Sequence, residues 1–361
     1  MTKKPVVAIL GATGAVGQEF IRLIEERNFP YSSLKLLASY RSAGKKMTVN
    51  GQEYTIEEAK PESFDGVDIG LFAGGSISKE LGPEAAKRGC VVIDNSSTFR
   101  MDPNVPLVVP EVNPQDIAWH KNIIANPNCS TIIMLMALKP IHDLSPIKKV
   151  VVSTYQAVSG AGKEGIDELQ EEAQAYLNGE EMHPHILPSK SLPKHYPIAF
   201  NLIPQIDKFM ENDYTKEEMK MVNETHKILH DDSIAVTPTT VRVPVFRSHA
   251  ESIMVETEDE LDINAVRKAI DAFPGAQMQD NPAEMEYPMP LYTAEKYDVY
   301  VGRLRRDLYN PKAINFWVSG DQIRKGAALN ALQIAEYMIA NDMIKSVSYT
   351  HLRAHETPEH L

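Results

Sequence analysis

The sequence predicts an α/β protein of two domains, a doubly wound parallel sheet followed by an α+β domain. The chain of 361 residues exceeds the usual size of one domain. Up to residue 128, short apolar segments alternate with helical ones, which is typical of parallel β-α-β units. Beyond residue 129 the apolar segments are longer and alternate in polarity, as in an antiparallel sheet. We therefore expect domains at 1–128 and 129–322.

The elements of the first domain follow from its apolar patterns. Residues 5–27, "PVVAILGATGAVGQEFIRLIEER", predict a buried strand, a glycine-rich turn and an amphipathic helix. A second helix is expected at 76–89, "SISKELGPEAAKRG". The further strands expected in this domain are 33–39, 67–74, 90–96 and 122–127.

The second domain combines strands with a long loop. Strands are expected at 148–160, 233–245 and 249–259, and a proline-rich loop at 183–207. Helical periodicity returns at 323–344. Residues 346–361, "SVSYTHLRAHETPEHL", carry no apolar stripe, and we expect a disordered or non-native tail there.

The composition excludes several classes of protein. Hydrophobic residues at 43% and charged residues at 24% are typical of a soluble globular chain, and no apolar run is long enough to span a membrane. The two cysteines cannot build a disulfide framework and fit a reducing, cytoplasmic setting. The net charge of −12 argues against general nucleic-acid binding. An anionic substrate would need a local cluster of arginines and lysines.

The segment "GATGAVG" predicts a dinucleotide site. Its glycines Gly11, Gly14 and Gly17 lie between a strand and a helix. A pyrophosphate needs a tight turn, close backbone approach and a helix N-terminus aimed at it. The alternative is a tight strand–helix turn without a ligand.

The end of the second strand favours NADP over NAD. An NAD site usually carries an acidic residue there, whereas "LLASYRSAGKK" has none and offers Arg41 and Ser42 instead. These two side chains would hold a 2′-phosphate. A solvated basic loop is the alternative.

Cys129, in "NPNCST", is the candidate nucleophile. It follows a turn and begins the predicted helix "STIIMLMALKPI". Free amides and the positive dipole end lower a thiol's pKa at such a position, and the amides can form an oxyanion hole. The alternative is a small buried hydrophobe. Together with a nicotinamide site, a thiolate suggests aldehyde oxidation through a thiohemiacetal and a thioester.

His249 is the candidate base. It lies in "VRVPVFRSHAES", between two predicted strands and close to Arg242 and Arg247. Arg242 and His249 have opposite parity, so one regular strand would point them to opposite faces, but Pro244 leaves room for a bend. A surface histidine is the alternative.

Six segments together carry a family resemblance. "GATGAVG", "NPNCST", "QAVSGAG", "EEMKMVNET", "RVPVFRSHAE" and "GDQIRKGAALNALQIAE" resemble the aspartate-semialdehyde dehydrogenase family, in order over residues 5–345. The resemblance implies a Rossmann-type NADP-binding domain and an α+β catalytic and dimerisation domain, similar to glyceraldehyde-3-phosphate dehydrogenase. It further implies that a C-terminal helix, 323–345, packs back on the first domain, and that the protein is a cytoplasmic homodimer without a bound metal.

The resemblance also assigns roles to residues. Cys129 matches the acyl-thioester nucleophile, His249 the acid/base catalyst that removes the thiol proton, and Gln156 the residue that orients the centre and contacts substrate. The implied substrate and phosphate contacts are Arg242 for the α-carboxylate, Glu217 for the amino group, and Arg100 and Lys220 for phosphate. The implied cofactor contacts are Thr13, Gly14, Ala15, Val16, Arg41, Ser42, Ser159, Gly160 and Gln322.

The implied reaction is the reversible, NADP-dependent conversion of L-aspartyl-4-phosphate to L-aspartate 4-semialdehyde and phosphate. It serves lysine, threonine, methionine, isoleucine and diaminopimelate synthesis. Two alternatives remain open. An N-acetyl-glutamyl-phosphate reductase would share the cofactor, the thiol and the histidine but would not need the acidic partner Glu217. A non-catalytic NADP-binding module would leave Cys129 as a core residue.

Overall fold

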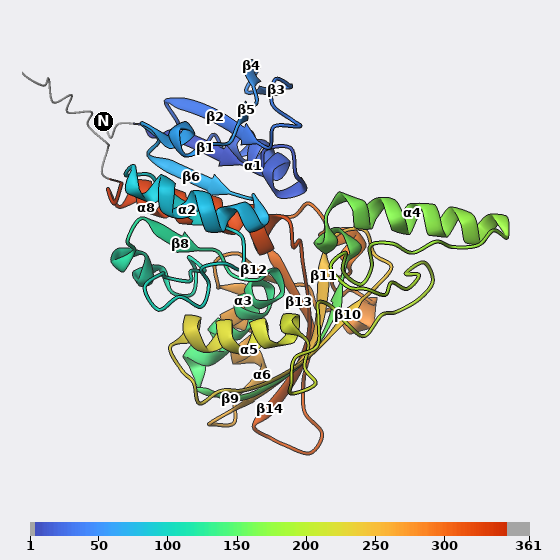
Figure 1. The fold of residues 1–361 in the computed structure, drawn as a ribbon. Helices are drawn as coiled ribbons and strands as arrows, with labels where there is room; N and C mark the ends of the chain where they lie inside the picture. The colour runs from blue at the N-terminus through green and yellow to red at the C-terminus, as the bar shows by residue number, and fades with distance from the viewer. Residues whose placement is uncertain (1–3, 345–361) are drawn as a thin grey trace, which may run out of the picture.

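The computed structural model describes residues 4–344, which form two six-stranded sheets and a separate two-stranded hairpin (Figure 1). The tail predicted over 346–361 lies outside the described residues. No helix within 4–344 is both long and apolar enough to cross a membrane.

The first sheet confirms the predicted doubly wound class. Its strand order is β5-β2-β1-β6-β7-β8, and every pair is parallel. The strands are β1 (Val6–Leu10), β2 (Ser33–Ala38), β5 (Glu57–Glu58), β6 (Ile69–Phe72), β7 (Val91–Asp94) and β8 (Ile123–Ala125). The prediction did not include β5 or the hairpin of β3 (Lys46–Val49) and β4 (Gln52–Thr55).

Helices cover both faces of this sheet. Val7 and Ile9 of β1 share a core cluster with α1 and α8, whereas Ala8 and Leu10 share another with α2. Because successive side chains of a strand point to opposite faces, β1 is buried on both sides and is apolar throughout. The helices of this half are α1 (Ala15–Glu26), η1 (Pro61–Phe64), η2 (Gly75–Ile77), α2 (Ser78–Lys87) and η3 (Pro114–Trp119).

The glycine turn between β1 and α1 depends on close backbone approach. Gly11 has φ +82°, and a Cβ there would lie 2.5 Å from the Ala73 oxygen. A Cβ on Gly17 would lie 2.1 Å from the Gly11 oxygen. Both positions therefore require glycine.

The second sheet is mixed, so the antiparallel prediction was wrong in part. Its order is β10-β9-β11-β14-β13-β12, with β10–β9 and β12–β13 parallel. The parallel β9–β10 pair needs a long crossover, which α4, the proline-rich loop and α5 supply. The strands are β9 (Ile147–Gln156), β10 (Ala235–Arg242), β11 (His249–Thr257), β12 (Ala276–Met278), β13 (Val299–Arg306) and β14 (Ala313–Gly320).

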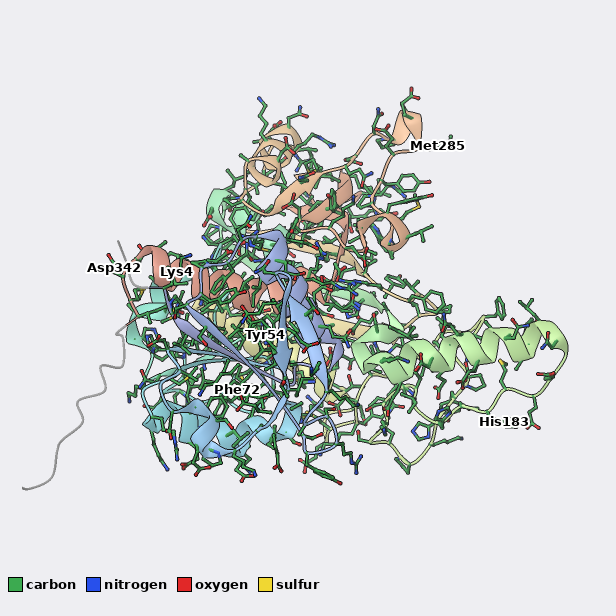
Figure 2. The ribbon with its side chains drawn as sticks, turned by 90° about the horizontal axis from the view of Figure 1, so that it is seen from above. Lys4, Tyr54, Phe72, His183, Met285 and Asp342 are labelled. Atoms are coloured by element: carbon green, nitrogen blue, oxygen red, sulfur yellow. The ribbon has the colours of Figure 1, made fainter. Side chains whose placement is uncertain are left out.

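Helices α3, α5 and α6 share one core cluster with this sheet. Helix α4 and the following segment, which carries His183, project from the body (Figures 1 and 2). They enclose a small core of their own around Val158, Leu169 and Ile198. The helices of this half are α3 (Cys129–Leu144), η4 (Val158–Ala161), α4 (Lys163–Asn178), α5 (Lys216–Leu229), α6 (Ile263–Asp271), η5 (Pro282–Glu284) and α7 (Pro290–Thr293).

The helix predicted over 323–344 starts differently. Residues Arg324–Ala328 form a π-helix, η6, and the regular helix α8 spans Leu329–Ala340. A Cβ on Gly326 would lie 2.9 Å from the Cys129 Cβ, so the wide turn brings its backbone against the start of α3. Helix α8 packs in the core cluster of the first sheet.

Candidate active site

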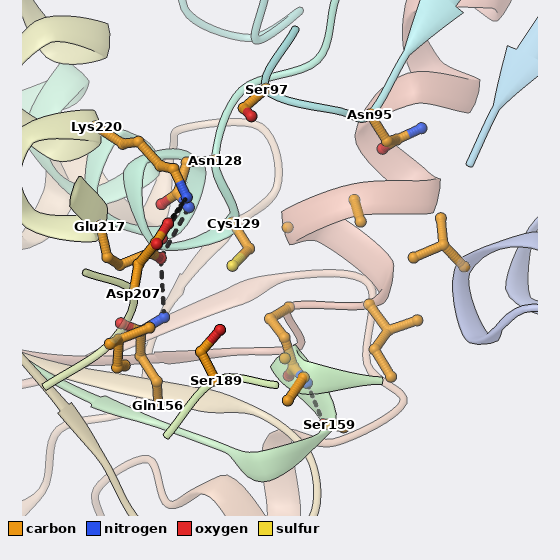
Figure 3. A pocket seen from close by; sticks show the side chains of 18 of the residues that line it. Asn95, Ser97, Asn128, Cys129, Gln156, Ser159, Ser189, Asp207, Glu217 and Lys220 are labelled. Carbon is orange, nitrogen blue, oxygen red and sulfur yellow. Dashed lines mark hydrogen bonds and ion pairs between the residues drawn. The ribbon is translucent and has the colours of Figure 1, made fainter. Parts of the chain in front are cut away.

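A cavity of about 440 Å³ lies where the two sheets meet, with Cys129 in its wall. Its lining comes from elements far apart in the chain, including α1, α3, α5 and the end of β9 (Figure 3). Besides Cys129, five predicted catalytic and substrate residues line it, namely Arg100, Gln156, Glu217, Lys220 and Arg242.

Three neighbouring strands place side chains at one edge of the second sheet. Gln156 ends β9, Arg242 ends β10 in register with it, and His249 begins β11 on the other side of β9. The parity argument therefore started from a wrong premise, because Arg242 and His249 lie on different strands. A loop from Val243 to Ser248 carries the chain across β9.

Cys129 begins helix α3, and its Sγ lies 3.4 Å from His249 Nε2. Burial, and then the Glu217 carboxylate, raise the pKa of the Cys129 thiol to about 12. The prediction of a pKa lowered by the helix N-terminus was thus wrong for the free site. Loss of water around the sulfur outweighs the positive charges of Arg100, Lys220 and Arg242.

Most amides at the start of α3 are already engaged, which corrects the predicted oxyanion hole. The Asn128 side chain caps the helix, and its Oδ1 accepts the Ser130 and Thr131 N–H groups at 3.1 and 3.2 Å. The Cys129 N–H has no protein acceptor within the described part of the chain. One backbone amide, not several, is left to face an oxyanion.

His249 is fully buried and held from two sides. The Ala157 backbone N–H donates to its Nδ1 at 3.0 Å, and Gln156 Nε2 lies 3.4 Å from its Nε2. Burial, and then the positive charge of Arg242, lower the pKa of His249 to about 3. The imidazole is therefore neutral throughout the physiological pH range.

Arg242 reaches the cavity with unused donors. Its Nη1 donates to the Ala157 carbonyl at 2.8 Å, while its buried Nε has no partner. Burial lowers the pKa of this guanidinium, which remains charged in the physiological range because an arginine pKa starts above 12. A Cβ on Gly160 would lie 2.9 Å from Nη1, so the glycine leaves room for the arginine.

Glu217 and Lys220 form a buried ion pair on α5. Lys220 Nζ lies 2.9 Å from Glu217 Oε2, and the other carboxylate oxygen accepts from Asn128 Nδ2 and Gln156 Nε2. Burial alone would raise the pKa of Glu217, but Lys220 and the two amides outweigh it and lower the pKa to about 2. The charged face of α5 is thus directed inward rather than solvated.

Arg100, the predicted phosphate ligand, already makes three contacts with other protein groups. Its Nε donates to the Asn126 carbonyl, its Nη2 to the Asn95 carbonyl, and its Nη1 pairs with Glu224 Oε1 at 3.1 Å. A guanidinium has five N–H groups, so two remain for an anion in the cavity.

The predicted cofactor residues divide into two groups. Val16, Ser159, Gly160 and Gln322 line the same cavity as Cys129. Gly11, Thr13, Gly14, Ala15 and Gly17 lie at or beside the turn that starts α1. Gly14 is the N-cap of α1 and provides no side-chain acceptor, so the amides there are open to a pyrophosphate.

Arg41 and Ser42 follow β2, beside the strand that leads into this turn. Arg41 is exposed and contacts the Tyr40 ring and hydroxyl. The residues present thus fit a nicotinamide dinucleotide, since they offer an open helix N-terminus, a cavity beside Cys129 and a basic residue after β2.

Sequence reasoning missed three residues that support the site. Asn128 caps α3, Glu224 accepts the Asn128 N–H at 2.6 Å, and Gly326 permits the approach of η6. The spacing of Glu217, Lys220 and Glu224 places them on one face of a helix and was a usable signal for Glu224. Gly326 carried no signal, because the contact joins segments almost 200 residues apart.

Comparison with known proteins identifies the family. Residues 6–120 match the "Semialdehyde dehydrogenase, NAD binding domain" and residues 138–325 the "Semialdehyde dehydrogenase, dimerisation domain". The chain is 54% identical over 332 residues to the aspartate-semialdehyde dehydrogenase of Bacillus subtilis, covering 91% of this chain and 96% of that protein. Identity to the Aquifex aeolicus enzyme is 53%, over 94% and 99% of the two chains.

A solved structure agrees with these relatives. The crystal structure of aspartate semialdehyde dehydrogenase II from Vibrio cholerae, complexed with ASA, aligns with a TM-score of 0.88 at 47% identity. The alignment covers 94% of this chain and 99% of the Vibrio chain. The chain belongs to the aspartate-semialdehyde dehydrogenase family.

Proposed function

We propose that this enzyme of the aspartate-semialdehyde dehydrogenase family reduces L-aspartyl-4-phosphate with NADPH, through a thioester on Cys129, and releases L-aspartate 4-semialdehyde and phosphate. The observation that carries the proposal is the 3.4 Å approach of Cys129 Sγ to His249 Nε2 in a cavity that also holds Arg242 and Glu217. The thiol would attack the acyl carbon beside the buried imidazole. The cation Arg242 and the anion Glu217 would bind the carboxylate and the ammonium group of an amino-acid acyl phosphate.

Arg242 and Glu217 suit the two ends of an α-amino acid. The guanidinium of Arg242 has an unpartnered Nε and faces the cavity, so it would pair with the α-carboxylate. Glu217 stays ionised because the pKa of its carboxyl is about 2, and it would accept from the ammonium group. An N-acetylated substrate would offer Glu217 only a neutral amide N–H, which makes a weaker hydrogen bond to a carboxylate than an ammonium group does.

Arg100 and Lys220 supply positive charge for the leaving phosphate. Arg100 retains two N–H groups beyond its protein contacts. Lys220, on α5, is close enough to Arg100 for the two positive charges to interact. Since phosphate carries most of the substrate's negative charge, these cations would orient the acyl phosphate with its carbonyl carbon toward Cys129.

NADP would be held by the turn at Gly11, Thr13, Gly14, Ala15, Val16 and Gly17, by Arg41 and Ser42 at the 2′-phosphate, and by Ser159, Gly160 and Gln322 near the nicotinamide. Gln322 donates to Ser159 Oγ and accepts the Ser248 N–H at 2.8 Å, so these groups form one buried wall beside His249. When bound, NADPH supplies the hydride that reduces the thioester carbonyl.

The chain's own groups perform the acyl transfer. Cys129 Sγ attacks the carbonyl carbon, and negative charge develops on the carbonyl oxygen. The Cys129 N–H and Gln156 Nε2 are the donors available to that oxygen, and His249 lies beside both. Asn128 holds the start of α3 in place, and Gln156 is oriented by Glu217 and by Thr154.

The wider setting is part of the proposal. The match of residues 138–325 to a dimerisation domain supports a homodimer, and the family supports a cytoplasmic role in lysine, threonine, methionine, isoleucine and diaminopimelate synthesis.

The reverse reaction offers a direct assay. Purified protein is mixed with L-aspartate semialdehyde, phosphate and NADP, and NADPH formation is followed by absorbance, with N-acetyl-glutamate semialdehyde and NAD in parallel. We expect phosphate-dependent turnover with L-aspartate semialdehyde and NADP, and none in Cys129→Ser. Preference for the N-acetylated aldehyde, or turnover without phosphate, would contradict the proposal.

A further inference from the structure

We propose that a second cavity, beside the one around Cys129, is an outer phosphate site through which phosphate enters and leaves while the dinucleotide stays bound, and that Lys216 is its outermost cation. The inference deepens the proposed function and rests on it for the identity of the anion. This second space, called the side cavity below, has a volume of about 210 Å³. It lies between helix α5 and the segment from Ser97 to Met101.

One face of α5 forms one wall of the side cavity. Lys216, Lys220 and Asn223 follow one another at intervals of four and three residues, so they lie on the same side of the helix and all line this space. The first turn of α5 is held by a capping box, in which Thr215 Oγ1 accepts the Glu218 N–H and the Glu218 carboxylate accepts the Thr215 N–H. The lining side chains of α5 are therefore carried by a well-fixed helix.

The opposite wall is fastened to the same helix. Lys227 Nζ, further along α5, donates to the carbonyl oxygens of Arg100, Asp102 and Val105 at 2.7, 2.7 and 2.8 Å. These three bonds attach the segment that carries Arg100 to α5. Both walls of the side cavity thus belong to one packed unit.

The two cavities share the residues that would bind the leaving phosphate. Ser97, Arg100 and Lys220 line both of them. The side chain of Arg100 is buried but keeps two N–H groups free of protein contacts, and its positive charge acts on that of Lys220. Because like charges held close together repel, an anion between these two side chains is favoured from either cavity.

The lining of the side cavity suits a dianion. It contains three cations, Arg100, Lys216 and Lys220, and one carboxylate, Glu224. That carboxylate is already engaged, since Oε1 accepts from Arg100 and Oε2 accepts the Asn128 N–H. Lys216 is exposed, and within residues 4–344 its Nζ makes no hydrogen bond or ion pair with another residue. A phosphate in the side cavity would give this ammonium group a partner.

A separate way in and out is useful because the other side of Cys129 is needed for the cofactor. Figure 3 shows Ser97 and Lys220 on one side of Cys129 and Ser159 on the other. Ser159 and Gln322 line the cavity around Cys129 where the dinucleotide would lie, so bound NADP would cover that side. Phosphate could still be exchanged at the end formed by Arg100 and Lys220.

The first test measures the dependence of the reverse reaction on phosphate. Lys216→Gln removes the outermost charge, and we expect KM for phosphate to rise by about threefold to tenfold. KM for the semialdehyde, KM for NADP and kcat should stay unchanged, because Lys216 does not line the cavity around Cys129. High salt should reduce the difference between the variant and the wild type, since it screens an exposed charge.

Two further variants make this test specific. Lys208→Gln is the matched control, because Lys208 is an exposed lysine that accepts the Lys216 N–H through its carbonyl but lines neither cavity. Asn223→Asp places a negative charge of nearly the same shape in the side cavity and should also raise KM for phosphate. An unchanged KM for phosphate in Lys216→Gln, or an equal rise in Lys208→Gln, would overturn the inference.

The second test needs no turnover. Crystals of the full chain, grown without phosphate or sulfate, are soaked in sodium tungstate, a tetrahedral dianion like hydrogen phosphate. We expect a tungsten peak in the side cavity within hydrogen-bond reach of Lys216 Nζ, and none there in Lys216→Gln. Tungstate in the cavity around Cys129 alone, or the same side-cavity peak in both proteins, would overturn the inference. A wild type that shows no phosphate-dependent turnover would instead contradict the proposed function.

Discussion

The cavity around Cys129 and an ion-pair cluster between α1 and the segment before α8 both contain buried charges, and they differ in how those charges are paired. In the cluster, Arg324 pairs with Glu19 at 2.7 Å and with Glu26 at 2.8 Å, and Arg247 pairs with Asp321 at 2.6 Å. In the cavity, Arg242 leaves its buried Nε without a partner.

This difference in pairing distinguishes charged groups that stabilise the fold from charged groups that are available to bind a ligand. Burial of an ion is costly, and a direct partner offsets that cost. The cluster meets this condition between α1, which starts at the cofactor turn, and the segment that precedes η6. In the cavity, hydrogen-bond donors such as Arg242 Nε have no protein acceptor, and a substrate carboxylate or oxyanion would accept from them.

Replacing Cys129 by serine gives the largest expected effect on the cavity side of this comparison. The change keeps the shape of the side chain but removes the nucleophile, so kcat should fall by about 10³-fold or more. The melting temperature should stay close to that of the wild type. Substantial turnover in the purified serine variant would contradict the assignment of Cys129.

Arg324→Met tests the cluster side. It removes this cation from the buried Glu19 and from the exposed Glu26, and we expect a loss of about 3 kcal/mol in the free energy of unfolding, mainly from Glu19. Urea denaturation measures this, and the exposed pair partner Lys163, as Lys163→Met, is the control with little expected effect. A small loss in Arg324→Met would remove the distinction between the two regions.

Arg242→Lys tests whether the unused donors serve the substrate. Lysine keeps the charge but loses the planar fork, so KM for the semialdehyde should rise by about tenfold to a hundredfold, with less change in stability than in Arg324→Met. Steady-state kinetics and a thermal melt distinguish the two. An unchanged KM would place the α-carboxylate elsewhere.

The wall of the cavity formed by Pro188, Ser189 and Lys190 offers a smaller test. Glu168 on α4 accepts the Ile186 and Leu187 N–H groups and so holds this segment. Glu168→Gln should raise KM several-fold, because an amide group cannot accept all of these bonds. Glu164→Gln is the matched control, since Glu164 makes only an exposed pair with Lys190. Equal KM values in both variants would show that the hydrogen bonds to Glu168 are not needed for substrate binding.

The last test concerns the pH dependence of stability, to which the buried His249 is one contributor among many titrating groups. Burial lowers the folded-state pKa of His249 to about 3, whereas an unfolded histidine has a pKa of about 6.5. The unfolded state therefore binds more protons below pH 6.5, and stability falls as the pH falls, by up to about 1.4 kcal/mol per pH unit. His249→Gln should lose part of this slope between pH 6 and 4, as measured by urea denaturation at each pH.

Local patterns were sufficient for several features. The glycines at 11 and 17, the buried β1 and the start of α3 at Cys129 were predicted from segments of a few residues, and the fold class is confirmed. Such features depend on backbone geometry and on the period of apolar residues, which neighbouring residues in the chain decide.

The predictions that were wrong share a physical cause, because each left out burial or contacts that appear only in the folded chain. The predicted low pKa of Cys129 counted the helix dipole but not the burial of the sulfur, and the predicted amide donors ignored the cap that Asn128 provides. The parallel pairing of β9 with β10 was missed because a crossover of nearly eighty residues separates them.

Local sequence was enough to predict the glycine turn, the place of Cys129 at the start of a helix and the family. Only the tertiary structure decided that Gln156, Arg242 and His249 meet at one sheet edge, and that the Ala157 N–H faces Nδ1 of the histidine. Propensity acts over a few residues, whereas burial and hydrogen-bond partners depend on segments that only folding brings together, and these set the protonation of the side chains in the cavity.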